Sequence, residues 1–345
     1  MDASQIYAHV QSHYGSVAKD LSNTQYGQNI ASAFGYSPQE LAEVPEGANL
    51  GLSCGNPMAI AKLRDGETVI DLGSGAGFDV FLAAKSVGPS GRAIGVDMNK
   101  SMLERANKNK QKAGAANVTF VESPITRVDL PSSIADCITS NCVINLVPEK
   151  EKQLVFNEMF RLLKPGGRLA ISDILAKTAL PEGLKSDMAM YVGCIGGASE
   201  VGAYEKYLRE AGFMNGLILD SKSDLNVYKD TNESGTTKGP CGTGSGCCGS
   251  QASPSSVEGQ KGSLKPCGPS PAGGETKVPS SSGESSGGST AAGCSMECLS
   301  CCEAEKTTTP ATLYKEWTDV DLNQWAGKDD PQILHRTPLI VYASY

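Results

Sequence analysis

The sequence has little basic charge, and it contains no long apolar run. Its 345 residues hold 30 lysines and arginines against 38 aspartates and glutamates, a formal net charge of -8. This balance argues against a nucleic-acid surface as the main partner. No stretch reaches the roughly eighteen consecutive apolar residues of a membrane span, and the N-terminus has no charged segment followed by an apolar one. We therefore expect a cytoplasmic protein, monomeric by default, that binds neither nucleic acid nor membrane.

The composition changes abruptly near residue 231. From there to about residue 300, Gly, Ser, Thr and Pro dominate and aliphatic residues are few. Such a segment cannot bury enough apolar surface to offset the entropy lost on ordering. We predict four parts: a helical N-terminal cap with a substrate loop, a cofactor-binding domain, a disordered low-complexity linker and a docking segment, which span 1–66, 67–230, 231–310 and 311–345.

A glycine-rich turn stands at the start of the expected cofactor-binding domain. The run Val69-Ile-Asp-Leu72 is typical of a buried strand, and apolar residues from Phe78 onward have helical spacing. Between them lies Asp71-Leu-Gly-Ser-Gly-Ala-Gly77. Closely spaced glycines let the backbone approach a ligand. The segment therefore predicts a nucleotide-binding corner formed by a strand, a turn and a helix N-terminus.

An acid ends the second expected strand. Asp97 lies twenty residues after Gly77, where an acid suits a ribose with two free hydroxyls. This fits NAD and S-adenosylmethionine equally, but dinucleotide sites usually carry G-x-G-x-x-G before a helix that faces a pyrophosphate. The present pattern resembles instead the first motif of S-adenosylmethionine-dependent methyltransferases. The expected cofactor residues are Asp71, Gly73, Ser74, Gly75, Gly77, Asp97, Met98 and Asn141.

Strands and helices alternate from residue 68 to about 230. The expected strands lie near 68–72, 92–97, 117–122, 135–141 and 168–174, with helices near 77–87, 100–113, 149–163 and 199–211. Alternation implies a parallel sheet covered on both faces. The apolar runs 217–219 and 225–228 suit an antiparallel pair that closes the sheet, and 339–342 is typical of a further strand. The expected fold is α/β, a Rossmann-like class I methyltransferase with a mostly parallel seven-stranded sheet.

Four of the twelve cysteines fall in the part expected to fold. Cys137 alternates within an expected strand, which favours a buried structural thiol. Cys142 follows the end of that strand, next to the glycine corner, where open α/β sheets bind ligands. Cys54 and Cys194 lie in loops that can fold over the same edge. The other eight, here called the tail cysteines, are Cys241, Cys247, Cys248, Cys267, Cys294, Cys298, Cys301 and Cys302.

Four segments together resemble the arsenite S-adenosylmethionine methyltransferases, and these are Asn49–Pro57, Asp71–Asp79, Ser140–Leu146 and Gly193–Ala198. The resemblance covers residues 46 to about 230. It implies an enzyme of arsenic biotransformation and detoxification in which Cys54, Cys142 and Cys194 hold trivalent arsenic and carry catalysis. It also implies a thiol reductant, glutathione or thioredoxin, as co-substrate. The family uses an upstream cysteine in a redox disulfide; no cysteine precedes Cys54 here, so that step is missing or a tail cysteine serves.

The residue types suit this chemistry. Trivalent arsenic is soft and thiophilic, as thiolates are. Three thiolates satisfy its three bonds and leave a lone pair that can attack the sulfonium methyl, helped by proximity and alignment. The attack needs no general acid or base, so the scarcity of histidine, with only His9, His13 and His335, is no objection. Binding to arsenic also draws each cysteine into its thiolate form.

Two other functions fit parts of the sequence. A methyltransferase of another small molecule, such as a lipid or a thiol, would leave Cys54, Cys142 and Cys194 as ordinary core residues. A cysteine-rich arsenic- or metal-binding protein would instead use the tail, where Cys247-Cys248 and Cys298-x-x-Cys301-Cys302 have the character of metal ligands. Arsenite-dependent methyl transfer separates the two enzymes, and an arsenite titration of a tail peptide tests the binding protein.

Overall fold

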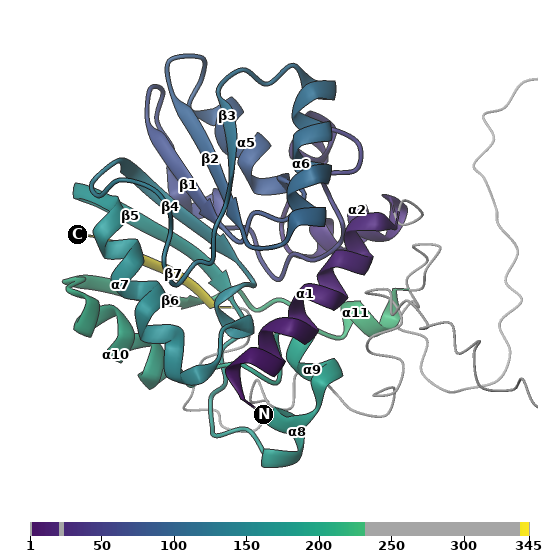
Figure 1. Cartoon of the computed structure of the whole chain (residues 1–345), viewed down its shortest axis with the longest axis vertical. Helices are drawn as coiled ribbons and strands as arrows, with labels where there is room; N and C mark the ends of the chain where they lie inside the picture. The colour runs from purple at the N-terminus through teal and green to yellow at the C-terminus, as the bar shows by residue number, and fades with distance from the viewer. Residues whose placement is uncertain (1, 21–23, 232–338, 345) are drawn as a thin grey trace, which may run out of the picture. The chain divides into compact units, whose positions relative to one another are not determined.

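The computed structural model describes residues 2–20, 24–231 and 339–344. All but one residue of the predicted linker, most of the predicted docking segment and the tail cysteines lie outside these ranges. No helix in the described ranges combines the length and apolar character needed to cross a membrane. The elements in Figure 1 follow the order α1 (Ala3–Lys19), α2 (Thr24–Ala33), α3 (Pro38–Glu43), α4 (Met58–Ala61), β1 (Thr68–Leu72), α5 (Phe78–Ser86), β2 (Arg92–Asp97), α6 (Lys100–Ala113), β3 (Val118–Glu122), β4 (Ala135–Asn141), η1 (Ile144–Leu146), η2 (Glu149–Glu151), α7 (Lys152–Leu162), β5 (Leu163–Asp173), α8 (Glu182–Ser186), α9 (Met188–Val192), α10 (Val201–Ala211), β6 (Asn215–Asp220), α11 (Val227–Asp230) and β7 (Leu339–Ser344).

The strands form one sheet in the order β3-β2-β1-β4-β5-β7-β6 (Figure 1). The first five are parallel, and β7 runs antiparallel to both β5 and β6. The strand order reverses between β1 and β4, which is where open α/β sheets bind their ligands. The predicted Rossmann-like α/β fold is therefore confirmed, and its ligand-binding edge lies at the glycine turn.

One predicted strand is wrong. Residues 217–219 lie in β6 as expected, but its partner is β7 near the C-terminus. The predicted partner, 225–228, instead leads into the short helix α11. Leu225 and Tyr228 are both buried, and residues three apart share a face of a helical turn rather than of a strand.

Side chains of the central strands alternate between two apolar layers. Ile70 and Ile138 face one layer with α7 and α10, whereas Val69 and Cys137 face the other with α5. This alternation is the two-residue period of a strand. Cys137 is thus a buried core residue, as predicted from its place in β4.

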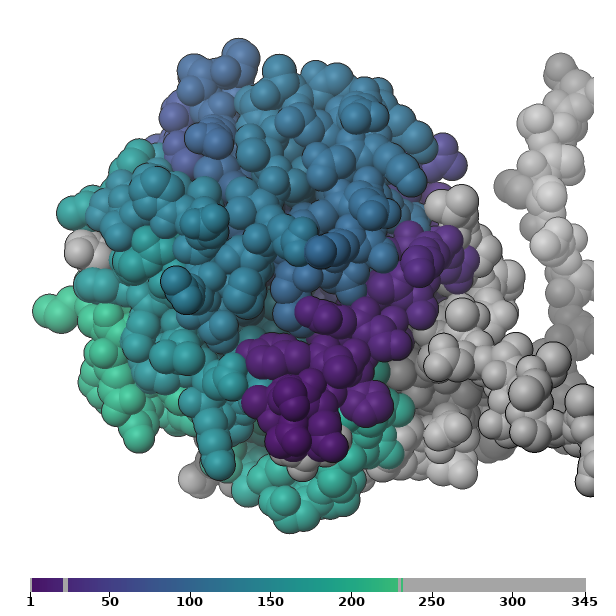
Figure 2. Space-filling view, viewed as in Figure 1, coloured from purple at the N-terminus to yellow at the C-terminus, as the bar shows by residue number. Residues whose placement is uncertain are grey.

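The N-terminal helices pack over the loops at the carboxyl ends of the strands. Asp2 begins α1 with a capping box to Gln5, and Ser37 begins α3 with a capping box to Glu40, which fixes both starts. Helix α1 contacts α6, α9 and η1 and lies on the surface across the front of Figure 2. The apolar side of α1 and α2 is buried in the same cluster as Cys54, Cys142 and Cys194.

Candidate active site

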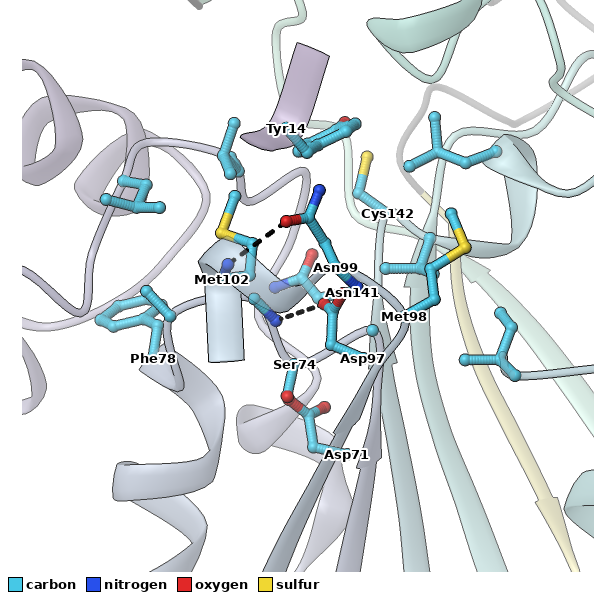
Figure 3. A pocket seen from close by; sticks show the side chains of 18 of the residues that line it. Tyr14, Asp71, Ser74, Phe78, Asp97, Met98, Asn99, Met102, Asn141 and Cys142 are labelled. Carbon is cyan, nitrogen blue, oxygen red and sulfur yellow. Dashed lines mark hydrogen bonds between the residues drawn. The ribbon is translucent and has the colours of Figure 1, made fainter. Parts of the chain in front are cut away.

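A cavity lies beside the glycine turn, at the carboxyl ends of β1, β2 and β4 (Figure 3). Helix α1 contributes Tyr14, which lies at the top of the view, and the segment after β4 contributes Cys142. Seven of the eight predicted cofactor residues line this cavity, and they are Asp71, Gly73, Ser74, Gly75, Asp97, Met98 and Asn141. These seven residues, chosen from the sequence pattern, therefore lie on one continuous surface.

The turn itself depends on glycine at Gly73. Its φ is 76°, in the left-handed region, and a Cβ there would lie 2.2 Å from Cγ2 of Val143. Gly77 has another role: it is the N-cap residue of α5, and a Cβ there would lie 2.8 Å from the rings of Phe81 and Phe120. Gly77 therefore allows α5 to pack closely, and it is the one predicted cofactor residue outside the cavity lining.

Asp97 holds the turn as well as facing the cavity. Its Oδ2 accepts a hydrogen bond from the Gly75 backbone N–H, and its Oδ1 accepts one from the Asn99 N–H, both at 2.8 Å. Asn99 in turn caps α6. Each carboxylate oxygen can accept a further bond, so ribose hydroxyls can still reach Asp97. The Gly75 N–H, in contrast, already donates to this carboxylate.

Two buried carboxylates, Asp71 and Asp79, form part of the cavity wall. Asp71 accepts a hydrogen bond from Thr139 at 2.7 Å, while Asp79 accepts bonds from Tyr36 at 2.6 Å and Asn141 at 3.0 Å. Burial raises the pKa of Asp79 to about 6. Burial, followed by the Asp79 charge, raises the pKa of Asp71 well above its usual value.

Within the described residues, no lysine or arginine forms an ion pair with either acid. Buried charges without a partner are costly, so this wall favours a positively charged ligand group. The sequence interpretation missed Asp79. The sequence feature that could have indicated it is an acid in the first turn of α5, the helix that follows the glycine turn.

These residues fit S-adenosylmethionine. The Ser74 hydroxyl is buried and bonds to no other described residue, so it has capacity for a ligand. Asp71 and Asp79 suit the ammonium group of the amino-acid end, and Asp97 suits the ribose. Met98 lines the same cavity and offers an apolar surface to the adenine. The Ser74 hydroxyl and the carboxylates of Asp71, Asp79 and Asp97 each have capacity for a further hydrogen bond to such a ligand.

Three free, buried cysteines meet at one side of this cavity. They pack in one apolar cluster, and the sulfurs of Cys54 and Cys142 lie within 4.8 Å of each other. The Cys194 thiol also donates to the Cys142 carbonyl at 2.7 Å. The backbone N–H of Cys54 donates to Oδ1 of Asn141 at 3.2 Å, which ties the Cys54 loop to the end of β4.

The Asn141 side chain mainly connects the protein segments around the cavity through hydrogen bonds. Besides accepting from Cys54, it donates through Nδ2 to Asp79, to the Tyr36 hydroxyl and to the Gly55 carbonyl, at 2.9 to 3.0 Å. These bonds connect the acid pair to the thiol cluster. The side chain predicted to contact the cofactor thus positions the two halves of the site relative to each other.

Two of the three cysteines adopt an unfavourable backbone conformation. Cys142 has φ 60° and Cys194 has φ 65°, in the left-handed region that costs an L-residue about 1–2 kcal/mol. Such residues concentrate at functional sites, where the surrounding structure holds them in place. Two such conformations within one cluster mark it as more than ordinary core packing.

The thiols are protonated in the ligand-free protein. Burial raises the pKa of Cys54 to about 12 and that of Cys142 well above its usual value. The hydrogen bond with Cys142, followed by burial, raises the pKa of Cys194. A soft centre that binds sulfur displaces these protons directly. The thiols are therefore poor nucleophiles in the absence of a ligand, and the cluster is suited to a thiophilic centre that displaces their protons.

Comparisons with known proteins agree with this geometry. The methyltransferase domain family matches residues 63–212. An arsenite methyltransferase from Halobacterium salinarum is 47% identical over 179 residues, which cover 52% of this chain and 45% of that protein. One from Aquipseudomonas alcaligenes is 35% identical over 223 residues, which cover 62% and 63%. The solved arsenic(III) S-adenosylmethionine methyltransferase from Chlamydomonas reinhardtii is 32% identical over 58% of this chain and 68% of that one, with a TM-score of 0.45.

Over its methyltransferase domain, the chain is similar in sequence to curated arsenite methyltransferases. The resemblance carried by the four sequence segments is thereby confirmed. The chain spans about half the length of the curated arsenite methyltransferases that it matches. The roles of Cys54, Cys142 and Cys194 remain predictions for this protein.

Proposed function

We propose that this protein transfers the methyl group of S-adenosylmethionine to trivalent arsenic held by Cys54, Cys142 and Cys194. One observation carries the proposal: three free, buried cysteines from three separate segments pack in one cluster, and Cys142, which packs between the cavity and the other two, lines the cavity that fits the methyl donor. Scattered core cysteines would lie apart, as Cys137 does in the layer against α5. Three sulfurs also match the three bonds of trivalent arsenic.

The cofactor, when bound, supplies an electrophilic methyl group on its sulfonium. The protein contributes by holding the cofactor and the arsenic next to each other. Asp71 and Asp79 hold the ammonium end, Asp97 holds the ribose, and Cys142 joins the cavity to the other two thiols. Holding both reactants in one small site accounts for much of the rate of such a transfer.

Binding of arsenite to the three thiols neither releases protons to the solvent nor takes them up. Arsenite, As(OH)₃, exchanges three hydroxyl groups for three cysteine sulfurs, and each thiol proton leaves with a hydroxyl as water. The raised thiol pKa values are therefore compatible with binding at neutral pH. Tyr14 covers the cluster, because its hydroxyl donates to the Val192 carbonyl at 2.9 Å and lies 3.9 Å from Sγ of Cys194. This cover limits the access of water.

The proposal extends to the wider reaction. A thiol reductant of the glutathione or thioredoxin kind serves as co-substrate and keeps the cysteines reduced. The biological role that follows is arsenic biotransformation and detoxification. Both statements rest on the family and on the thiol chemistry of the site.

Product analysis tests the proposal. The full chain is incubated with arsenite, S-adenosylmethionine and glutathione or reduced thioredoxin, and arsenic species are separated and quantified. We expect methylated arsenic from the unsubstituted protein and from Cys137→Ser, the matched control at a buried cysteine outside the cluster. Cys142→Ser should lose this product, since a hydroxyl is a harder and much less acidic ligand. Full arsenite methylation by Cys142→Ser, folded by circular dichroism, would show that the methyl acceptor is another molecule.

A further inference from the structure

A buried carboxylate adjoins the thiol cluster. Asp173 ends β5 and is fully buried. One of its oxygens and the sulfurs of Cys54 and Cys142 all lie within 4.8 Å of one another. The three residues come from a loop before β1, the segment after β4 and the end of β5. The arrangement thus depends on the tertiary fold.

The Asp173 carboxylate has bonding capacity to spare. Its Oδ2 accepts a hydrogen bond from the Tyr204 hydroxyl at 3.2 Å. The backbone N–H groups of Ile174 and Ile144 face the carboxylate, but no described residue completes a hydrogen bond to Oδ1. The nearby Lys152 ammonium is bonded instead to Glu149 at 3.0 Å and Ser199 at 2.7 Å. A buried oxygen without a protein partner can accept a bond from a water or an ion.

Trivalent arsenic does not require this oxygen, because three sulfurs complete its bonds. A tetrahedral d¹⁰ cation is different, since it takes four ligands and accepts sulfur and carboxylate oxygen together. Zinc at about 2.3 Å from sulfur and 2.0–2.2 Å from oxygen places its ligand atoms roughly 3.6–3.8 Å apart. Since the observed atoms lie within 4.8 Å of one another, they would close by at most about 1 Å, a change within reach of side-chain rotation. Cys194, whose thiol donates a hydrogen bond to the Cys142 carbonyl, can supply a further sulfur.

We propose that Cys54, Cys142 and Asp173 form a binding site for a thiophilic divalent cation, with Zn²⁺ as the representative, and that this cation excludes arsenite from the same thiols. The cation site rests on the geometry alone, whereas the exclusion of arsenite also rests on the proposed function. Arsenite methylation would then be inhibited by zinc and restored by a chelator.

Binding measurements test the site in the full-length protein with its tail cysteines changed to serine, so that added zinc reports on the folded part. Isothermal titration with Zn²⁺ should show one tight site, and prior zinc loading should weaken arsenite binding. Asp173→Asn should lower zinc affinity by about 10- to 100-fold, at least the loss seen for residues that merely support a metal ligand. It should affect arsenite much less. Cys137→Ser, the matched control, should match the parent with both ligands.

X-ray absorption on the one-equivalent zinc complex gives a second test that needs no Asp173 variant. We expect a mixed shell with Zn–S near 2.3 Å and Zn–O near 2.0–2.2 Å. An all-sulfur shell, or equal zinc affinity for Asp173→Asn, would overturn the carboxylate ligand. Zinc binding that leaves arsenite affinity unchanged would overturn the shared site. Tight zinc binding without any arsenite binding by the parent protein would support the cation site and contradict the proposed function.

Discussion

Replacing Asp79 by asparagine should make the ligand-free protein more stable while weakening cofactor binding. Asp79 is buried and shares the cavity wall with a second buried acid, Asp71. Asparagine is almost the same size, and its oxygen can still accept the hydrogen bond from Tyr36. Its amide group, however, would face the donating Nδ2 of Asn141. The substitution therefore removes a buried charge and loses one hydrogen bond.

The magnitude follows from the pKa of Asp79, which burial raises from 3.8 to about 6. Each unit corresponds to about 1.4 kcal/mol, so the ionised side chain costs the folded state about 3 kcal/mol at neutral pH. Because the pKa is higher in the folded state, that state binds the proton more tightly. The cost is small near the unfolded pKa, grows as pH rises, and is complete above the folded pKa. Removing the Asp79 charge also relieves Asp71, which acts in the same direction.

The lost hydrogen bond costs about 1 kcal/mol at any pH. Asp79→Asn should therefore be nearly neutral at about pH 4.5 and stabilising by about 2 kcal/mol at about pH 8. Chemical denaturation at several pH values measures the difference, with Asp129→Asn, at an exposed position, as the control. A stability difference that does not change with pH would refute the reasoning, since a buried charge that titrates must produce the dependence.

Cofactor affinity should move in the opposite direction. If Asp79 holds the ammonium end of S-adenosylmethionine, Asp79→Asn should weaken binding at about pH 8 by roughly 1–3 kcal/mol, the usual loss for a charged hydrogen bond. Methylthioadenosine, which lacks the amino-acid end, should bind both proteins alike in calorimetry. Equal losses for the two ligands would mean that the substitution had distorted the cavity as a whole.

Three other substitutions test separate parts of the site. At Cys142, where φ is 60°, the glycine variant should be about 1 kcal/mol more stable than the alanine variant. At Cys137 in β4 the alanine variant should instead be more stable than the glycine variant by about 0.5–1 kcal/mol. If denaturant unfolding ranks glycine and alanine in the same order at both positions, the backbone at Cys142 is not strained. Asp97→Ala should weaken S-adenosylmethionine binding by about 1–3 kcal/mol, and an unchanged Kd in calorimetry would count against a ribose contact. Cys54→Ser should lose methylation of arsenite but keep that of monomethylarsenite, which needs one thiolate fewer; product speciation showing equal loss on both substrates would refute this.

The sequence was most informative where local patterns carry the structure. Alternating strands and helices predicted the parallel sheet that the structure contains. The partner of β6 was not predictable in this way. Strand β6 at Asn215 pairs with Ser344 at the other end of the chain, and backbone hydrogen bonds between distant segments leave no local pattern. Leu225 and Tyr228 were assigned to a strand because an apolar run of four residues fits either period.

Some residues of the candidate site could be predicted from the sequence, and others could not. The cysteines and the glycine turn stood out because their residue types have few roles in such positions. Asp79 and Asp173 did not, since an acid in a first helical turn or at a strand end is common and usually faces water. Only the tertiary contacts show that both are buried, with Asp79 against Tyr36 and Asp173 beside Cys54. The Asp97 bond to Gly75 was also beyond sequence reasoning, because it depends on where the turn folds back.

Several unfavourable features of this fold lie close together at the cavity. Cys142 and Cys194 hold strained backbone conformations, Asp71 and Asp79 are buried acids, and Oδ1 of Asp173 bonds to no described residue. Each lies at the cavity or against the thiols beside it, whereas Cys137, on the opposite layer, sits in regular strand geometry. Local rules that are broken together at one site usually reflect function. Under the proposed function, a cationic cofactor would offset the cost of the buried acids and a thiophilic centre would bind the strained cysteines, so the ligands would supply contacts that the protein alone lacks.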